Sequence, residues 1–394
     1  MSRNVPKLRF KGFEDEWKKY ELDDIAMISK SKYNPTKSNK TYKCIELEHI
    51  AQEDGRILGY VNSKEQNSIK NKFDSGDILF GKLRPYLKKY WISNFEGVCS
   101  SEIWVLKARK ISNSFLYRIV QSEKFNNIAN VSSGSKMPRA DWNYMSSTIF
   151  LVPKLNEQEK IANFLSKVDS IIEKQEKKVQ YWNSYKKGMM QKIFSQKIRF
   201  KDGNGMDYPE WEKKNLKYVL SEISEKTKEN NQYEVLSSTA NGVFKQSEYF
   251  NREIASADNT GYKILRLNQI VLSPQNLWLG NINYNNKYDM GIVSPSYKIF
   301  NINKNLNEKY ISYIIKTDRM LYGYKQASEQ GASVVRRNLN MDLFYDILIN
   351  IPCVEEQEKI ANFLSNIDNI IEKESKKLEE LKQWKKGLLQ QLFV

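Results

Sequence analysis

The sequence has one histidine and three cysteines in 394 residues, too few for several kinds of catalytic or metal site. His49 would have to serve any Cys/His or Ser/His pair, and the alternating residues around it, Glu46 to Ile50, predict a strand edge and a structural role. Cys44, Cys99 and Cys353 lack the paired spacing of a disulfide framework or a zinc cluster. We therefore expect reduced thiols and no bound metal.

The motifs of nucleotide hydrolysis and methyl transfer are also missing. No Gly-x-x-x-x-Gly-Lys-Ser/Thr loop is present to hold phosphates, and no Gly-x-Gly-x-x-Gly turn or Asn/Asp-Pro-Pro-Tyr box is present for a methyltransferase. A metal-dependent nuclease would need a Glu-x-Lys element on a strand, whereas Glu157-Gln158-Glu159-Lys160 recurs at residues 356–359 at the start of a predicted helix. These absences favour a binding role over an enzymatic one, with no cofactor.

Long apolar stretches are absent as well. No segment approaches the ~20 apolar residues of a membrane span, and the N-terminus lacks the apolar core of a signal peptide. We expect a cytoplasmic protein.

Positive charge is abundant. The net charge is +16, and residues 1–200 contribute +15 of it. Such an excess favours a polyanionic partner, either nucleic acid or an anionic membrane surface, and charge alone does not choose between them.

An internal repeat organises the chain. Residues 152–194 align without gaps onto residues 351–393, with 23 of 43 positions identical. A weaker similarity precedes each domain, where Leu8-Arg9-Phe10-Lys11 corresponds to Ile198-Arg199-Phe200-Lys201. The regions between these markers share little more than Gly97-Val98-Cys99-Ser100 with Gly291-Ile292-Val293-Ser294. The pattern predicts two related but diverged domains with similar connectors.

The connectors predict long helices. Apolar residues recur in alternating steps of four and three, which is the pattern of a heptad seam. The first seam comprises Ile161, Leu165, Val168, Ile172, Gln175, Val179, Trp182, Lys186, Met189 and Ile193, and the second Ile360, Leu364, Ile367, Ile371, Glu374, Leu378, Leu381, Lys385, Leu388 and Leu392. Polar residues interrupt both seams at the same two places, which indicates a specified register. Asn156 and Glu159 form a capping-box pattern that predicts a helix start near residue 156. We expect the two helices to pair; the alternative is that each packs only on its own domain.

The remaining segments predict mixed α/β domains with many short strands. Apolar runs between turn residues indicate strands at residues 78–80, 103–106, 270–272 and 297–300, and apolar spacing indicates helices at residues 115–125 and 309–324. The predicted fold class is α+β, with two mixed α/β domains separated by two long helices that form a coiled coil, in a pseudo-two-fold repeat. The expected boundaries are 1–150 for the first domain, 151–197 for the first helix, 198–350 for the second domain and 351–394 for the second helix.

Basic residues interleaved with aromatics mark candidate contacts with DNA. Basic and aromatic side chains in residues 82–91 can meet phosphates and base edges, although a solvated strand end is an equally good interpretation. Glycine-opened basic loops at residues 134–139 and 331–337 occupy equivalent places before the two helices. Amide side chains in residues 275–278 can pair with adenine. The candidate DNA-binding residues are Lys82, Arg84, Tyr86, Lys136, Arg139, Gln275, Asn276, Trp278, Arg336 and Arg337.

The connector motifs carry a family resemblance. Leu151-Val152-Pro153 leading into Asn156-Glu157-Gln158-Glu159-Lys160-Ile161-Ala162, with its second copy at Ile351-Pro352 into Glu355–Ala361, resembles the conserved regions of type I restriction-modification specificity subunits. The resemblance covers essentially the whole chain. It implies two target recognition domains, each reading one half of a split, asymmetric DNA target, held apart by two antiparallel helices. It also implies two modification subunits that bind S-adenosylmethionine and methylate adenine, and restriction subunits that translocate and cut. None of these activities is expected in this chain.

Three other functions compete with this interpretation: a stand-alone basic DNA-binding regulator, an unrecognised nuclease, and a coiled-coil scaffold. The half-chain repeat disfavours all three.

Overall fold

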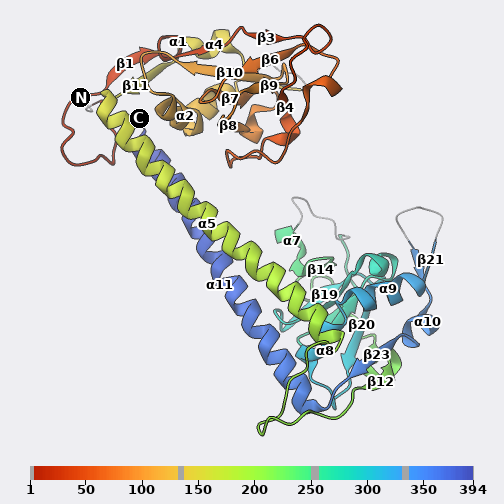
Figure 1. Cartoon of the computed structure of the whole chain (residues 1–394). Coiled ribbons are helices and arrows are strands. Elements are labelled where there is room, and N and C mark those ends of the chain that lie inside the picture. The colour runs from red at the N-terminus through yellow and green to blue at the C-terminus, as the bar shows by residue number, and fades with distance from the viewer. Residues whose placement is uncertain (1–3, 132–136, 250–256, 331–336, 394) are drawn as a thin grey trace. The chain divides into compact units, whose positions relative to one another are not determined.

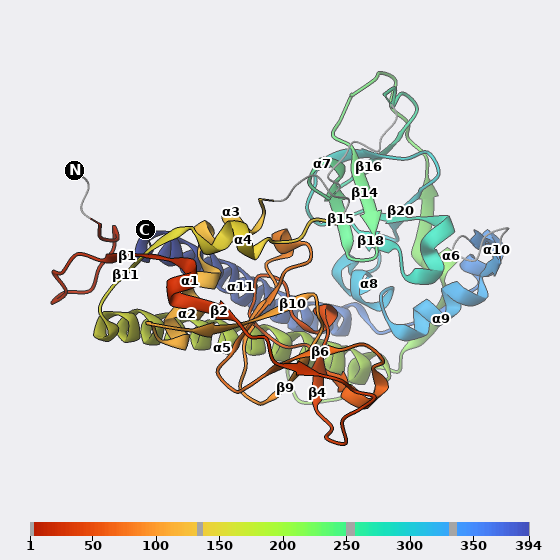
Figure 2. The same ribbon diagram turned by 90° about the horizontal axis from the view of Figure 1, so that it is seen from above.

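The computed structural model of the chain describes residues 4–131, 137–249, 257–330 and 337–393. The chain divides into two compact units, one made of residues 1–177 with 375–394 and the other of residues 178–374. Each unit therefore contains one mixed α/β domain together with a segment of each long helix (Figure 1 and Figure 2).

The first unit is built around a four-stranded antiparallel sheet in the order β2-β10-β7-β8. A second, five-stranded sheet has the order β3-β6-β9-β4-β5, and β1 pairs with β11. The predicted strands at residues 78–80 and 103–106 are confirmed as β7 and β10. The elements of this domain are β1 (Lys18–Glu21), α1 (Leu22–Ile25), β2 (Ala26–Ile28), β3 (Lys32–Tyr33), β4 (Lys43–Ile45), η1 (Leu47–His49), β5 (Val61–Asn62), η2 (Ser63–Glu65), β6 (Lys70–Phe73), β7 (Ile78–Gly81), η3 (Pro85–Leu87), β8 (Tyr90–Ile92), β9 (Gly97–Cys99), β10 (Ile103–Ala108), α2 (Asn113–Gln121), α3 (Glu123–Ala129), α4 (Trp142–Ser146) and β11 (Ile149–Val152).

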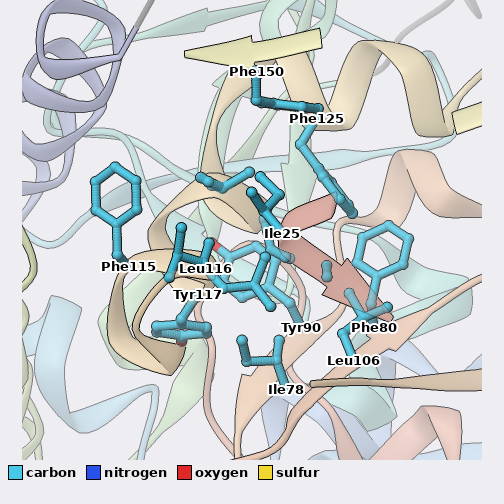
Figure 3. Close-up of a cluster of buried hydrophobic side chains, with 14 of the residues drawn as sticks. Ile25, Ile78, Phe80, Tyr90, Leu106, Phe115, Leu116, Tyr117, Phe125 and Phe150 are labelled. Carbon is cyan, nitrogen blue, oxygen red and sulfur yellow. The ribbon is translucent and has the colours of Figure 1, made fainter. Parts of the chain in front are cut away.

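The core of this unit lies between the four-stranded sheet and helices α2 and α3. Phe80 from β7, Phe115 from α2 and Phe125 from α3 are fully buried in it (Figure 3). The ring centroids of Phe80 and Phe125 are 5.2 Å apart in an edge-to-face arrangement, the geometry that aromatic pairs prefer. Phe80 lies near the end of β7, so its burial fixes the position of the segment that follows this strand.

In the described residues, the second unit repeats the four-stranded sheet of the first unit, but not its five-stranded sheet. Its four-stranded sheet has the order β13-β20-β17-β18, which corresponds strand for strand to the sheet of the first unit, and β12 pairs with β23 as β1 pairs with β11. The predicted strands at residues 270–272 and 297–300 are confirmed as β17 and β20. The elements are β12 (Glu212–Asn215), α6 (Leu216–Val219), β13 (Leu220–Ile223), β14 (Leu236–Thr239), β15 (Gly242–Lys245), α7 (Gln246–Tyr249), β16 (Lys263–Arg266), β17 (Ile270–Leu272), η4 (Pro274–Leu279), β18 (Ile282–Tyr284), β19 (Met290–Val293), β20 (Lys298–Ile302), α8 (Glu308–Ile314), α9 (Asp318–Gln326), β21 (Ser328–Gln330), β22 (Arg337–Leu339), α10 (Met341–Tyr345) and β23 (Leu348–Ile351).

The short sequence match between the two domains marks a close approach of strands. A Cβ atom added to Gly97 would lie 2.8 Å from the carbonyl oxygen of Lys43, and one added to Gly291 would lie 3.1 Å from the carbonyl oxygen of Glu234. Neighbouring parallel pairings run beside both glycines, between β4 and β9 and between Val235 and Ile292. The glycine is retained in both diverged domains because a side chain would collide with the adjacent strand.

Two helix predictions need correction. The predicted helices at residues 115–125 and 309–324 are each two helices, α2 with α3 and α8 with α9. The break falls at Ser122 in the first unit and at residues 315–317 in the second, and the side-chain oxygens of Ser122 and Thr317 accept a hydrogen bond from the backbone of the next helix at 3.3 Å and 3.4 Å. A capping hydroxyl ends one helix and starts the next while the spacing of the apolar residues continues across the break. Periodicity alone therefore predicts one helix.

The strand-edge prediction for His49 is also wrong. His49 ends the 3₁₀ helix η1, where its Nδ1 accepts a hydrogen bond from the backbone N–H of Glu46 at 3.0 Å. The residue keeps the structural role expected of it, as a cap rather than as part of a strand.

The long helices are α5 (Leu155–Phe194) and α11 (Val354–Leu392). In the first unit Asp169 and Glu176 of α5 pair with Lys385 and Lys382 of α11, and in the second unit Lys178 and Lys186 pair with Glu374 and Asp368. Partner numbers fall on one helix as they rise on the other, so the helix segments of each unit run antiparallel. Every predicted seam residue is buried or half-buried, which confirms the seam.

The helix segments also pack on the domain of their own unit. Ile161 and Leu165 of α5 and Leu388 of α11 belong to the same buried cluster as the domain residues Phe115 and Phe125. Helix pairing and packing on the domain, treated as alternatives at the level of sequence, therefore occur together.

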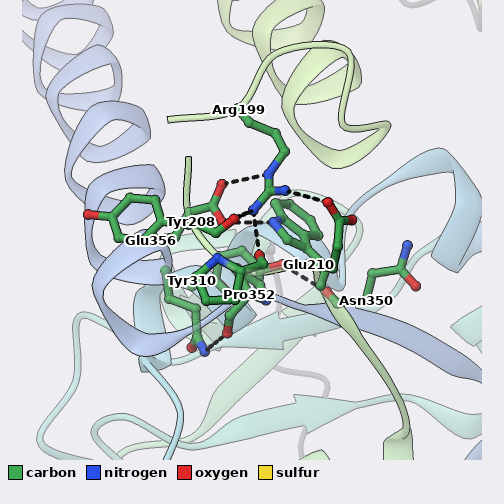
Figure 4. A network of polar contacts seen from close by, with 10 residues as sticks. Arg199, Tyr208, Glu210, Tyr310, Asn350, Pro352 and Glu356 are labelled. Carbon is green, nitrogen blue, oxygen red and sulfur yellow. Dashed lines mark hydrogen bonds and ion pairs between the residues drawn. The ribbon is translucent and has the colours of Figure 1, made fainter. Parts of the chain in front are cut away.

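The repeated Glu-Gln pair at each helix start anchors the domain to the helix. In the second unit Glu356 accepts hydrogen bonds from Arg199 Nη2 and from Trp211 Nε1, both at 2.9 Å (Figure 4). In the first unit Glu157 accepts from Arg9 at 2.8 Å and 2.9 Å. The following glutamines, Gln158 and Gln357, donate to the carbonyl oxygens of the preceding prolines at 2.9 Å and 2.8 Å. The strong identity of this motif between the two copies therefore has a structural cause. The Glu-x-Lys pattern lies on a helix in both copies, and not on a strand as in a metal-dependent nuclease.

Candidate nucleic-acid interface

The candidate segment of the first unit follows β7, a central strand of the four-stranded sheet. The backbone of residues 82–84 pairs with residues 138–140: Arg84 N donates to Pro138 O at 2.8 Å, and Ala140 N donates to Lys82 O at 2.9 Å. Two candidates far apart in the sequence, Arg84 and Arg139, are thereby brought onto neighbouring chain segments. Lys136 lies outside the described residues.

Arg84 and Tyr86 present their side chains to solvent. Arg84 adopts a left-handed backbone conformation (φ 52°) that leads into η3, and its side chain has no ion pair within the described ranges. Tyr86 in η3 is 53% exposed. A left-handed residue with a large side chain costs energy, and such strain recurs at functional sites. Lys82 is half-buried.

Arg139 is already engaged. Its Nε and Nη2 lie 3.0 Å and 3.1 Å from the two carboxylate oxygens of Glu102, a two-point pairing. The hydrogen bonds from Arg139 hold the pKa of Glu102 below its usual value, with a further contribution from the charge of Lys82. Arg139 can bind an external anion only in competition with Glu102.

The candidate segment of the second unit occupies the corresponding place. It follows β17, the counterpart of β7, and forms η4, the counterpart of η3. Gln275 is exposed, whereas Asn276 is half-buried and its Nδ2 lies 3.4 Å from Ser273 Oγ. The basic segment of the first domain and the amide segment of the second have no sequence similarity that relates them, but the shared strand order shows that they are equivalent.

Arg337 and Trp278 are brought together from distant parts of the sequence. Arg337 begins β22, and its guanidinium carbon lies 4.6 Å from the centroid of the Trp278 ring, in cation–π geometry. Within the part of the chain that the structure describes, Arg337 Nε is buried and has no hydrogen-bond partner. Arg336 lies outside the described residues. The pair offers a planar cation fixed on an aromatic surface, an arrangement suited to a phosphate or to a guanine edge.

A basic groove of about 1200 Å³ opens in the second unit. It is lined by cations from the end of α5, from α9 and from the segment just before α9, among them Lys187, Lys192, Lys316 and Arg319, and by amides such as Asn241 and Asn283. Lys316 donates to the carbonyl oxygen of Gly280, the residue that ends η4, at 3.1 Å. Burial of its ammonium group lowers the pKa of Lys316 to about 8. The groove could not be predicted from the sequence, because its cations come from two segments far apart in the chain, residues 186–197 and 316–319, and show no common period.

Within the described ranges, no helix has the length and apolar content that a membrane crossing requires.

Comparisons with known proteins agree on one family. Residues 14–180 and 208–383 match the family described as type I restriction modification DNA specificity domain, so each half of the chain carries one match. The chain is similar to the type I restriction enzyme MjaVIII specificity subunit of Methanocaldococcus jannaschii, with 23% identity covering 96% of this chain and 92% of that protein. It is also similar to the type I restriction enzyme EcoDI specificity subunit of Escherichia coli, with 28% identity over 42% of this chain, a match that spans only 37% of that subunit.

A solved structure supports the fold. The S subunit of a type I restriction-modification system from M. genitalium aligns over 99% of both chains, with a TM-score of 0.55 and 15% sequence identity. The family match covers most of the chain and falls once on each half, as the internal repeat requires, and the chain belongs to the type I restriction-modification DNA specificity family.

Proposed function

We propose that this chain is the DNA-sequence-reading specificity subunit of a type I restriction-modification complex, with no catalytic centre of its own. Each recognition domain reads one half of a bipartite, asymmetric target. The observation that carries the proposal is the repetition of one sheet topology, with an exposed basic or amide segment after the same central strand in both units. Both segments combine groups that contact phosphates with groups that contact base edges.

The domain boundaries follow from this proposal. Residues 1–150 and 198–350 are the recognition domains, and residues 151–197 and 351–394 are the connecting helices. The ten candidate residues, from Lys82 to Arg337, are the proposed contacts with DNA, and Arg84, Tyr86, Gln275 and Arg337 are the members whose side chains are best placed to reach it. Divergence of the two domains fits halves that read different sequences.

The proposed partners are double-stranded DNA, two modification subunits that bind S-adenosylmethionine and methylate adenine, and restriction subunits that translocate and cut. A subunit with this role acts in the cytoplasm, where the chromosome and these partners are found. The helices serve two purposes: they dock the modification subunits and they set the spacer between the half-sites.

The first test is selection of DNA by the assembled complex. The chain, co-purified with a modification subunit, is incubated with a random-sequence duplex library, and bound DNA is sequenced. We expect enrichment of a two-part motif with a fixed gap. Enrichment of one continuous motif by the chain alone, with no partner retained, would instead support the second candidate, a stand-alone DNA-binding regulator, which the +16 charge also fits.

The second test addresses the spacer. One heptad is added to each helix, after Val179 and after Leu378, so that the seam stays continuous. Seven residues lengthen a helix by about 10 Å, which is about three base pairs of B-DNA. We expect the extended protein to select unchanged half-sites with a longer spacer, or to lose binding because the second half-site is also turned about the duplex axis by about 100°. Retention of the original spacer at full affinity would show that the helices only dock partners.

A further inference from the structure

The lysines that interrupt the two seams have matching partners. In the first unit Lys385 Nζ of α11 lies 2.7 Å from Asp169 Oδ1 of α5. In the second unit Lys186 Nζ of α5 lies 2.5 Å from Asp368 Oδ1 of α11. Asp169 corresponds to Asp368 and Lys186 to Lys385 in the repeat, and both positions are identical in the two copies. A charged pair at one seam position fixes the register of antiparallel helices.

The second oxygen of each aspartate binds the recognition domain. Asp169 Oδ2 lies 2.6 Å from Arg118 Nη1 in α2, and Asp368 Oδ2 accepts a hydrogen bond from the hydroxyl of Tyr313 in α8 at 2.6 Å. The two contacts are equivalent in position, because the backbone N–H of the residue that caps α2 donates to Gln158 as that of the residue that caps α8 donates to Gln357. Each aspartate therefore joins three elements of its own unit: one helix, the antiparallel helix and the recognition domain.

In the first unit, the burial of the partners shows that this link matters for orientation. The side chain of Arg118 is 5% exposed and that of Lys385 is 14% exposed, while Asp169 is 34% exposed. A buried cation needs its counter-ion held in one geometry. If α2 moved along α5, the buried guanidinium of Arg118 would lose its counter-ion, Asp169, and the loss would cost free energy. The apolar core lacks this directional restraint, because hydrophobic packing is non-directional.

We propose that Asp169 and Asp368 are positioning residues that fix the orientation of each recognition domain on the helix pair, and that they thereby restrict the spacer lengths that the target can have. The inference rests on the proposed function. It assigns to two side chains a property that is otherwise attributed to helix length alone.

The two sites differ in one respect that sharpens the test. Asp169 faces two cations, Arg118 and Lys385, whereas Asp368 faces one cation, Lys186, and the neutral hydroxyl of Tyr313. Exchange of the charged residues, Asp368→Lys with Lys186→Asp, keeps an ion pair and leaves Tyr313 able to hydrogen-bond. The corresponding exchange at Asp169 and Lys385 places a lysine against Arg118. The exchange in the second unit should preserve the preference of the complex for the native spacer, and the exchange in the first unit should weaken that preference.

The experiment measures binding of the assembled complex to duplexes that keep both half-sites and vary the spacer by one or two base pairs. Asp169→Asn and Asp368→Asn should raise binding of the altered spacers relative to the native one by about fivefold or more, since a hydrogen bond to a charged group contributes about tenfold or more to an equilibrium constant. Half-site preference should not change, because no contact with DNA is altered. The exchanged pair in the second unit should restore the native spacer profile.

Tyr313→Phe is the milder variant that keeps the test decisive if an aspartate variant fails to fold. It removes only the hydroxyl that links α8 to Asp368, and the Lys186–Asp368 pair remains. Tyr322→Phe, at a residue that is 66% exposed, is the matched control. A spacer profile that Tyr313→Phe and the folded aspartate variants leave unchanged overturns the inference while the proposed function stands. Absence of a two-part preference in the wild-type complex would instead reject the proposed function.

Discussion

The guanidinium of Arg337 lies over the indole ring of Trp278, 4.6 Å from its centroid, and so joins β22 to η4. The two residues are 59 positions apart in the sequence, and each was selected for a different reason, one as a cation and the other as part of an amide-rich segment. Their contact turns two separate candidates into one surface. A stacked guanidinium is held with its donors in one plane, ready for a planar acceptor.

The first prediction concerns this pair. Arg337→Ala should weaken specific DNA binding by about 1 to 3 kcal/mol if the arginine reads a base, and Arg337→Lys should restore little, because lysine has no planar fork. Binding is measured by titration of the assembled complex with a labelled target duplex. Recovery of full affinity with lysine would show that only the charge matters, as expected for a contact with phosphate.

The second prediction concerns the ion pair of Arg139 with Glu102. Glu102→Gln removes the competing carboxylate and leaves the amide in its place, so Arg139 becomes available to DNA and affinity should rise. Arg84, which has no ion pair in the described residues, gives the opposite change: Arg84→Ala should lower affinity, and a lost phosphate contact reduces the salt slope by about one. Both are read from binding constants at several salt concentrations. If Glu102→Gln leaves the affinity unaltered, Arg139 does not face the DNA.

The third prediction concerns Lys316. Its pKa of about 8 lies below the ordinary 10.5, because the ammonium is partly removed from water. The unfolded chain binds the proton more tightly, so folding becomes more favourable as pH rises from about 8 toward 10.5, by an amount that solvent screening keeps small. Labelling with an amine-reactive reagent, followed by mass spectrometry, should show the modification rate of Lys316 levelling off above about pH 8 to 9. A rate that keeps rising through pH 10 would contradict the lowered pKa.

The fourth prediction concerns four glycines. Gly97→Ala and Gly291→Ala place a Cβ within 3.1 Å or less of a neighbouring carbonyl oxygen and should destabilise the fold by about 1 to 3 kcal/mol. Gly188→Ala and Gly387→Ala are the controls, because both glycines lie inside long helices and a Cβ there meets nothing within 4 Å. Each of these substitutions should raise the free energy of unfolding by about 0.5 to 1 kcal/mol. Denaturant unfolding measures the four changes. The account fails at these positions if the two pairs change stability in the same direction.

The long helices are the elements that could be predicted most fully from the sequence. A heptad seam depends on many residues that repeat one period, so errors at single positions do not change the interpretation, and the polar interruptions at Lys186 and Lys385 indicated register before their partners were known. What the seam could not indicate is that Asp169 and Asp368 provide those partners, because neither lies on the seam. Cross-helix contacts depend on the pairing geometry as well as on the period.

The candidate site was only partly accessible from sequence. Residue type selected Arg84, Arg139 and Arg337 equally, whereas the structure separates them: one is unpaired among the described residues, one is bound by Glu102 and one is stacked on Trp278. Such differences arise from strands that pair across long sequence separations. The equivalence of η3 with η4 was likewise hidden, because the two segments share a place in the fold and almost no residues.

The most direct test of the central claim maps the target of the complex with one recognition segment altered at a time. Adenine methylation is sequenced across a genome in cells that express the modification subunit with the wild-type chain, with Arg84→Ala and Tyr86→Ala together, or with Gln275→Ala. We predict that the first variant relaxes sequence preference in one half of the motif only, and that the second relaxes it in the other half only, with the spacer unchanged. Loss of preference in the same half for both variants, or across the whole motif, would contradict the assignment of one half-site to each domain.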